Sequence, residues 1–206
     1  QPVSKMAREA FEFVNLYSKW RGVNRWPAVK MVLDLLRERP EVAARGVKIP
    51  EWRGLDAFIK SGCTLSNEGL RDFIGKCGDP SLVGDLLTMW EWTHAVNRFV
   101  GDIVHGVPPF AFVRESLEKA APKADIMVVS ATPGEALVRE WKEHDIAKYA
   151  AVIAGQEMGT KEEHLALAAK GRYPSDRILM IGDAPGDHKA AKKNNALFFP
   201  INPGAE

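Results

Sequence analysis

Residues 178–187 read Ile-Leu-Met-Ile-Gly-Asp-Ala-Pro-Gly-Asp, an apolar run that ends in two carboxylates. Apolar residues of mostly β-forming type before a Gly-Asp turn predict a buried strand that delivers Asp183 to its carboxyl end. Asp187 follows a Pro-Gly turn and precedes a lysine-rich stretch that we expect to be helical. Ligands of open α/β sheets bind beyond the carboxyl ends of the strands, and two carboxylates there suit Mg²⁺. A Gly-Asp turn alone is weak evidence, because aspartate also simply ends strands and caps helices.

The second half of the chain alternates between strand and helix patterns. Amphipathic helical segments separate four short apolar runs, at residues 126–129, 151–154, 178–181 and 196–201. Such alternation predicts a parallel sheet with helices on both faces. We therefore expect a doubly wound, Rossmann-like α/β core over residues 108–206.

Residues 1–107 contain no convincing strand pattern and predict a separate all-helical domain. Apolar residues recur at three- and four-residue spacing from Val3 to Tyr17, which indicates an amphipathic helix. Further helices are expected to begin near three prolines, Pro27, Pro50 and Pro80. The last of these should extend towards Val104. Five of the six tryptophans fall in this half, and we expect most of them in its core.

The charge of the chain is balanced, with 28 Lys and Arg against 27 Asp and Glu. No basic excess points to nucleic acid or to a membrane surface, and no apolar run approaches the roughly 20 residues that span a bilayer. Cys63 and Cys77 lack metal-ligand spacing and are interpreted as reduced bystanders. We expect a cytoplasmic protein that binds neither nucleic acid nor membranes. No sequence pattern indicates its oligomeric state.

The strand at residues 126–129 ends at Ser130, in a context that suits an anion. Thr132 and Glu135 predict a capping box, with Pro133 at the first position of a helix that opens just past the serine. The free N–H groups of such a helix, together with the Ser130 hydroxyl, would form an anion site.

The strand at residues 151–154 leads to a second predicted capping box, made by Thr160 and Glu163. This places Lys161 in the first turn of a helix, where the macrodipole disfavours a cation unless an anion compensates it. Lys161 is therefore either a functional residue or an ordinary solvated lysine. A hydroxyl, a lysine and a carboxylate pair at successive strand ends are the groups that phosphoryl transfer requires.

Three segments, residues 128–133, 159–161 and 181–187, resemble the second, third and fourth motifs of the haloacid dehalogenase superfamily in order and spacing. The resemblance covers about the last hundred residues. It implies that Ser130 hydrogen-bonds the transferring phosphoryl group and that Lys161 neutralises the phosphate and the nucleophile.

The resemblance also implies a cofactor and a substrate site. Asp183 would bind Mg²⁺ directly, and Asp187 would be a second ligand or an outer support. The helical half would be the cap domain of this superfamily's first cap class. Its Trp20–Trp26 turn is a candidate for substrate contact or simply a structural loop. The expected substrate-binding residues are Ala131, Thr132, Arg21 and Arg25.

The family's first motif, an apolar strand that ends in Asp-x-Asp and supplies the nucleophile, has no counterpart in this sequence. In this fold the missing strand is central and lies between the strands that end at Ser130 and Asp183. Its absence would leave two buried edges with unpaired backbone groups, at a cost of about 1–3 kcal/mol each. Because the chain also begins at Gln1 rather than at a methionine, we expect an upstream segment that carries the nucleophile.

The implied function is that of a Mg²⁺-dependent phosphatase, which hydrolyses a small phosphorylated metabolite through an aspartyl-phosphate intermediate. A haloacid-cleaving relative would need no metal, and a phosphonate-cleaving relative would need a cap lysine, for which Lys19 and Lys30 are candidates. A non-catalytic scaffold or phosphoprotein-binding member that kept the fold and lost the nucleophile is the alternative from another class.

Overall fold

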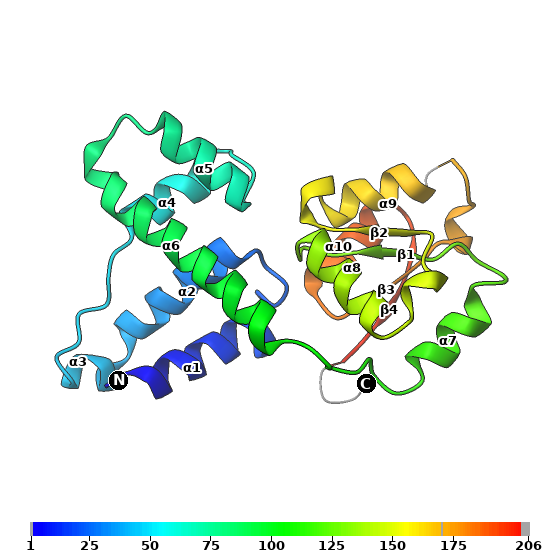
Figure 1. Cartoon of the computed structure of the whole chain (residues 1–206), viewed down its shortest axis with the longest axis horizontal. Coiled ribbons are helices and arrows are strands. Elements are labelled where there is room, and N and C mark those ends of the chain that lie inside the picture. Colours follow the sequence, from blue (N-terminus) through cyan, green and yellow to red (C-terminus); the bar gives the residue numbers. More distant parts are fainter. Residues whose placement is uncertain (1, 170, 203–206) are drawn as a thin grey trace. The chain divides into compact units, whose positions relative to one another are not determined.

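The computed structural model describes residues 2–169 and 171–202 and combines helices with parallel strands (Figure 1). Its contacts divide the chain into two compact units, Gln1–Asp102 and Ile103–Glu206. The expectation of an upstream segment rests partly on Gln1, which lies outside the described residues.

The first unit contains helices and, over residues 2–102, no strand. Its elements are α1 (Ser4–Glu12), a π-helical turn (Phe13–Tyr17), α2 (Arg25–Glu38), α3 (Pro40–Ala44), α4 (Arg53–Lys60), α5 (Asn67–Lys76) and α6 (Pro80–Ile103). Pro80 opens α6 as predicted, whereas α2 begins two residues before Pro27 and α4 begins three residues after Pro50. Among the described helices, none is long and apolar enough to cross a bilayer.

Two apolar clusters hold the first unit together. One joins α1, α2 and α3 through a set of small and aliphatic side chains that includes Met6, Val14 and Leu36. The other is centred on Trp26, which is 1% exposed and meets Phe58 edge to face at a ring separation of 5.6 Å. A tryptophan core was expected and is confirmed at this position, because such rings bury large apolar areas.

The second unit alternates helices and strands. Its elements are α7 (Val113–Ala120), β1 (Met127–Val129), α8 (Gly134–Glu143), β2 (Val152–Ala154), α9 (Lys161–Ala169), β3 (Leu179–Gly182), α10 (Pro185–Lys193) and β4 (Leu197–Pro200). Short 3₁₀ turns span Ala147–Tyr149, Gln156–Met158 and Ser175–Arg177. All four predicted strands are therefore present.

The strands pair in parallel, but as two separate sheets. Val128 of β1 lies opposite Ile153 of β2, and Met180 of β3 lies opposite Phe198 of β4. Within the described residues no ladder joins one pair to the other. The mixed helix and sheet class is confirmed, while the expected continuous doubly wound sheet is not formed by these residues.

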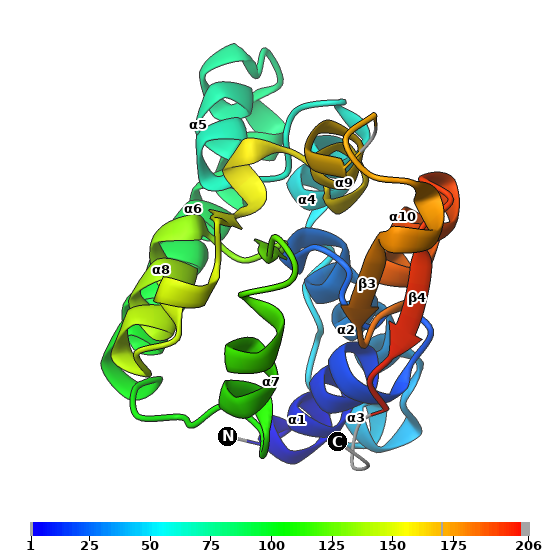
Figure 2. The ribbon, with the colours of Figure 1, turned by 90° about the vertical axis from the view of Figure 1, so that its right-hand side faces the viewer.

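One face of the β3–β4 sheet carries the core of the second unit. Met180 and Ala191 are buried there among residues of α9 and α10, and Phe198 packs at the edge of the same cluster. Figure 2 shows α10 beside β3 and β4, and the helix contacts both strands.

The opposite face of the same sheet is exposed, against expectation. Successive strand residues point to opposite faces, and the outward set consists of four large apolar side chains that are 53–60% exposed, Leu179, Ile181, Leu197 and Phe199. The prediction that the strand at residues 178–181 is buried is wrong for this face, because no described element of the second unit covers it.

Candidate active site

Asp187 anchors the turn between β3 and α10. It is the third residue of α10 and only 2% exposed, and its Oδ2 accepts the backbone N–H groups of Asp183 and Ala184, both at 3.1 Å. A carboxylate at this position satisfies donors that a helix start leaves unpaired and complements the helix dipole. The predicted Pro-Gly turn is instead the first turn of the helix itself.

Gly182 makes room for that carboxylate. A Cβ at this position would lie 2.4 Å from Oδ2 of Asp187 and 2.6 Å from its Cγ. The glycine of the Gly-Asp turn is therefore required by the close approach of the Asp187 side chain.

Lys161 is the first residue of α9 and pairs with Asp187. Its Nζ lies 2.5 Å from Oδ1, with the lysine side chain 25% exposed and the aspartate side chain 3% exposed. Both oxygens of Asp187 thus have partners. A cation in the first helical turn requires a compensating anion, and here that anion is Asp187. The two strand ends are joined by this contact.

The second predicted capping box is confirmed. The Thr160 N–H donates to Oε2 of Glu163 at 2.8 Å, and the Glu163 N–H donates to the Thr160 hydroxyl at 3.2 Å. The Thr160 hydroxyl also donates to the Glu163 carboxylate. These hydrogen bonds, that of the backbone N–H above all, hold the pKa of Glu163 below its usual range. The box fixes where α9 begins and therefore where Lys161 stands.

The first predicted capping box is not formed. α8 begins at Gly134, after Pro133 as its N-cap, without a side-chain capping hydrogen bond. The Gly134 N–H instead donates to the carboxylate of Glu157, at 2.8 Å to Oε1 and 3.2 Å to Oε2. The proposed anion position at this helix end is thus occupied by an acidic side chain of the chain itself.

A close approach of backbones makes this contact possible. A Cβ on Gly155, just after β2, would lie 2.2 Å from the Gly134 nitrogen. Sequence reasoning missed Glu157. The available signal was the glycine that follows the strand, since a glycine there often marks a close backbone approach.

Ser130 is held within the β1–β2 end of the unit. Its N–H donates to the Ala154 carbonyl at 3.0 Å, and its Oγ accepts the Thr132 N–H at 3.1 Å. Ala131 is exposed, and the Thr132 carbonyl accepts the Gln156 N–H at 3.0 Å. Ser130 and Thr132 therefore stand at a strand end as predicted, but the helix after them begins at a Gly134 N–H that is already bound by Glu157.

His164 is a buried polar side chain that the sequence did not single out. It lies on α9, one turn from Lys161, and is 5% exposed. Neither ring nitrogen has a hydrogen-bond partner among the residues that the structure describes. A buried imidazole without partners is unusual in a packed core.

The two aspartates fit a metal unequally. Asp183 is exposed at the carboxyl end of β3, which suits a direct Mg²⁺ ligand. Asp187 is buried and its oxygens already accept three donors, which suits a supporting role. Residues 2–169 and 171–202 contain no group of three or more His, Cys, Asp and Glu side chains that could hold a metal ion.

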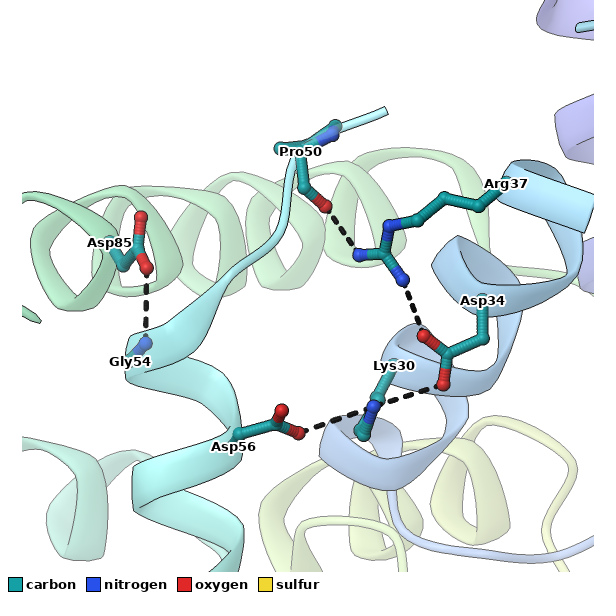
Figure 3. A network of polar contacts seen from close by, with 7 residues as sticks. All are labelled: Lys30, Asp34, Arg37, Pro50, Gly54, Asp56 and Asp85. Atoms are coloured by element: carbon teal, nitrogen blue, oxygen red, sulfur yellow. Dashed lines mark hydrogen bonds and ion pairs between the residues drawn. The ribbon is translucent and has the colours of Figure 1, made fainter. Parts of the chain in front are cut away.

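The predicted cap residues lie in the first unit. Arg21 is half-buried in the turn before α2, and Arg25 is the first residue of that helix. Lys30, a candidate Schiff-base lysine, pairs with Asp34 at 3.0 Å and Asp56 at 3.3 Å (Figure 3). These two carboxylates, the Asp34 hydrogen bond first, raise the pKa of Lys30. An amine that forms a Schiff base needs a lowered pKa.

Comparisons with known proteins add no relative: no protein-family model matches the chain, and no match was found among curated proteins or solved structures.

Proposed function

We propose that the second unit is the α/β core of a Mg²⁺-dependent phosphatase of the haloacid dehalogenase type, acting on a small phosphorylated metabolite. The observation that carries the proposal is the ion pair between Lys161 and Asp187. Residues from the third and fourth sequence motifs meet there, at the carboxyl ends of two strands, where open α/β sheets bind ligands.

Each residue has a role that its surroundings support. The Lys161 ammonium would neutralise an incoming phosphate, and Asp187 would hold that ammonium in place. Asp183, exposed beside them, would bind Mg²⁺ through its carboxylate. The Ser130 hydroxyl would donate to a phosphoryl oxygen. Bound Mg²⁺ would supply charge neutralisation to the transferring phosphoryl group.

In this proposal the attacking carboxylate would come from a further strand. β1 and β3 each have one edge without a ladder partner among the described strands, and Val129 of β1 packs against the cluster that contains Met180 of β3. A parallel strand inserted between these edges would join the two pairs into one sheet and satisfy their backbone groups. An aspartate at its carboxyl end would then lie next to Ser130 and Asp183. The doubly wound, Rossmann-like core is therefore part of the proposal.

The test is hydrolysis of a panel of phosphorylated metabolites by the full polypeptide that carries these residues, with and without Mg²⁺. We expect turnover that needs Mg²⁺ and stops with EDTA. Turnover that survives EDTA would contradict the metal role, and no turnover of any ester would favour the non-catalytic alternative.

Two aspartate variants separate chemistry from stability. Asp183→Asn should abolish turnover with little change in the free energy of unfolding, because the side chain is exposed. Asp187→Asn should lower both, because its buried carboxylate has three donors to satisfy. Wild-type turnover in Asp183→Asn would overturn the site.

A non-catalytic scaffold or phosphoprotein-binding member of the same fold is the second candidate. It is favoured by the closed Lys161–Asp187 pair and by Glu157 at the start of α8, since both contacts are complete without a ligand. Phosphonate cleavage through Lys30 is disfavoured by its two carboxylate partners.

A further inference from the structure

Arg25 breaks two local rules in the first unit. It is the first residue of α2, whose first turn contains no acidic residue, so the helix dipole opposes its charge. It is also half-buried, and burial lowers its pKa. Cations in such places are normally compensated by a carboxylate.

The partners of Arg25 are neutral. Its Nη1 donates to the Thr93 hydroxyl at 2.7 Å and to Oδ1 of Asn97 at 2.8 Å, both on α6. Among the described residues no carboxylate lies within 4.0 Å of the guanidinium. By contrast, Arg39 pairs with Glu9 in the same unit.

The hydrogen bonds fix which atoms remain available. A guanidinium can only donate, so Asn97 must present its amide oxygen to Arg25. Thr93 is fully buried and accepts from Arg25, so its single proton goes to Oδ1 of Asn67, 2.9 Å away at the start of α5. Both asparagines therefore use their oxygens as acceptors inside the cluster, and their NH₂ groups remain available as donors.

What the cluster leaves unused is a set of donors. The Nε and Nη2 groups of Arg25 and the Nδ2 groups of Asn67 and Asn97 have no acceptor in the described part of the chain. The Nε–H and Nη2–H groups lie on one edge of the guanidinium and match two oxygens of a carboxylate or a phosphate, and side-chain amides add neutral donors around them.

We propose that Arg25, Asn67 and Asn97 form an oxyanion-binding site on the helical unit, with Thr93 as the residue that orients it. The ligand is a small molecule with a carboxylate or phosphate group. Arg25 is also one of the residues expected to bind the phosphorylated substrate, but the contacts that form this site all lie within the first unit, so the site does not require the second unit to be a phosphatase.

The experiment is an NMR titration of the whole chain, which follows the side-chain signals of the Arg25 Nε–H and the two asparagine NH₂ groups. Inorganic phosphate and malonate are added separately at constant ionic strength. We expect saturable shifts of these signals with at least one of them, and the anion that binds identifies the group recognised. Absence of saturable shifts with both would overturn the proposal.

Three variants make the test specific. Arg25→Gln should weaken binding at least about tenfold, a loss of about 1.4 kcal/mol, and Arg71→Gln, which removes an exposed arginine of α5 paired with Asp72, should leave it unchanged. Asn97→Asp places a carboxylate within the chain beside Arg25, and it should abolish anion binding while raising the thermal unfolding midpoint. Wild-type affinity in Asn97→Asp would contradict the site, even if Arg25→Gln failed to fold.

Discussion

At the scale of single residues, the position of the Asp187 carboxylate depends on Gly182, which has no side chain. Because a Cβ on Gly182 would lie 2.4 Å from Oδ2 of Asp187, Gly182→Ala should displace the carboxylate and release the two backbone N–H groups that it accepts. We expect the free energy of unfolding, measured with urea, to fall by about 1–3 kcal/mol.

Gly186 provides the matched control. It lies in the first turn of α10 beside Asp187, and a Cβ there would meet no atom within 4 Å. Gly186→Ala should leave stability unchanged or raise it, by up to about 1 kcal/mol, because alanine favours helix. Equal stability of the two variants would show that the Asp187 carboxylate does not require a glycine at position 182.

Glu163 gives a prediction that depends on pH. Its pKa is lowered in the folded chain by the hydrogen bonds from Thr160, so its contribution to stability is present above the pKa of the unfolded chain. That contribution is lost as pH falls through the lower folded value. Glu163→Gln should therefore reduce the loss of stability in unfolding experiments between about pH 6 and pH 3.

Glu135→Gln is the comparison for this measurement. Glu135 also lies in a first helical turn, but α8 has no side-chain capping hydrogen bond. Because this change removes no capping hydrogen bond, Glu135→Gln should leave the free energy of unfolding at neutral pH close to that of the wild type. If the free energy of unfolding falls with pH as steeply in Glu163→Gln as in the wild type, the capping hydrogen bonds of Glu163 do not contribute to the acid sensitivity.

At the scale of elements, two ion pairs join α9 to α10 and differ in burial. Lys161 pairs with the buried Asp187, and Lys193 pairs with the more exposed Glu162. Lys161→Met should cost about 3 kcal/mol, since it leaves a buried carboxylate without its cation, whereas Lys193→Met should cost less than about 1 kcal/mol.

A double-mutant cycle isolates the buried contact. Lys161→Met combined with Asp187→Asn should be less destabilised than the two single changes predict, with a coupling of about 1–3 kcal/mol. Additive effects in urea unfolding would mean that the two side chains do not interact.

The sequence predicted the elements better than their assembly. The apolar runs and the Thr160–Glu163 box placed the four strands and the start of α9, because these signals are local. The same reasoning failed at α8, where the capping carboxylate comes from Glu157, a residue 23 positions from Gly134. Local spacing carries no information about such a distant partner.

The candidate site divides in the same way. Lys161 and Asp187 were predicted as site residues because each follows a predicted strand. Their contact is expected because parallel strands end at the same edge of a sheet. The cluster around Arg25 was found only in part, because Thr93, Asn67 and Asn97 lie on helices whose packing the sequence does not specify.

At the scale of the whole molecule, an exposed apolar sheet face coincides with little net charge. Leu179, Ile181, Leu197 and Phe199 face outward, and the chain carries a formal charge of only +1. Patches of this kind promote association when electrostatic repulsion is weak. We expect light scattering to show concentration-dependent self-association of the 206-residue chain.

Substitutions on and off this face test the cause. Ile181→Lys should suppress the association without unfolding the chain, because the side chain is 60% exposed. Leu167→Lys alters a 77% exposed leucine of α9 outside this face and should leave the association unchanged. Equal behaviour of the two variants would rule out the sheet face as the source.

Glu157 makes any anion binding at the start of α8 an exchange reaction. An incoming phosphate meets a carboxylate already bound to the Gly134 N–H, so its apparent affinity measures the difference between two anions rather than the strength of one. The internal carboxylate never dissociates from the chain, and it therefore competes at a fixed effective concentration. Discrimination at this helix end would rest on how much better than a carboxylate a ligand fits.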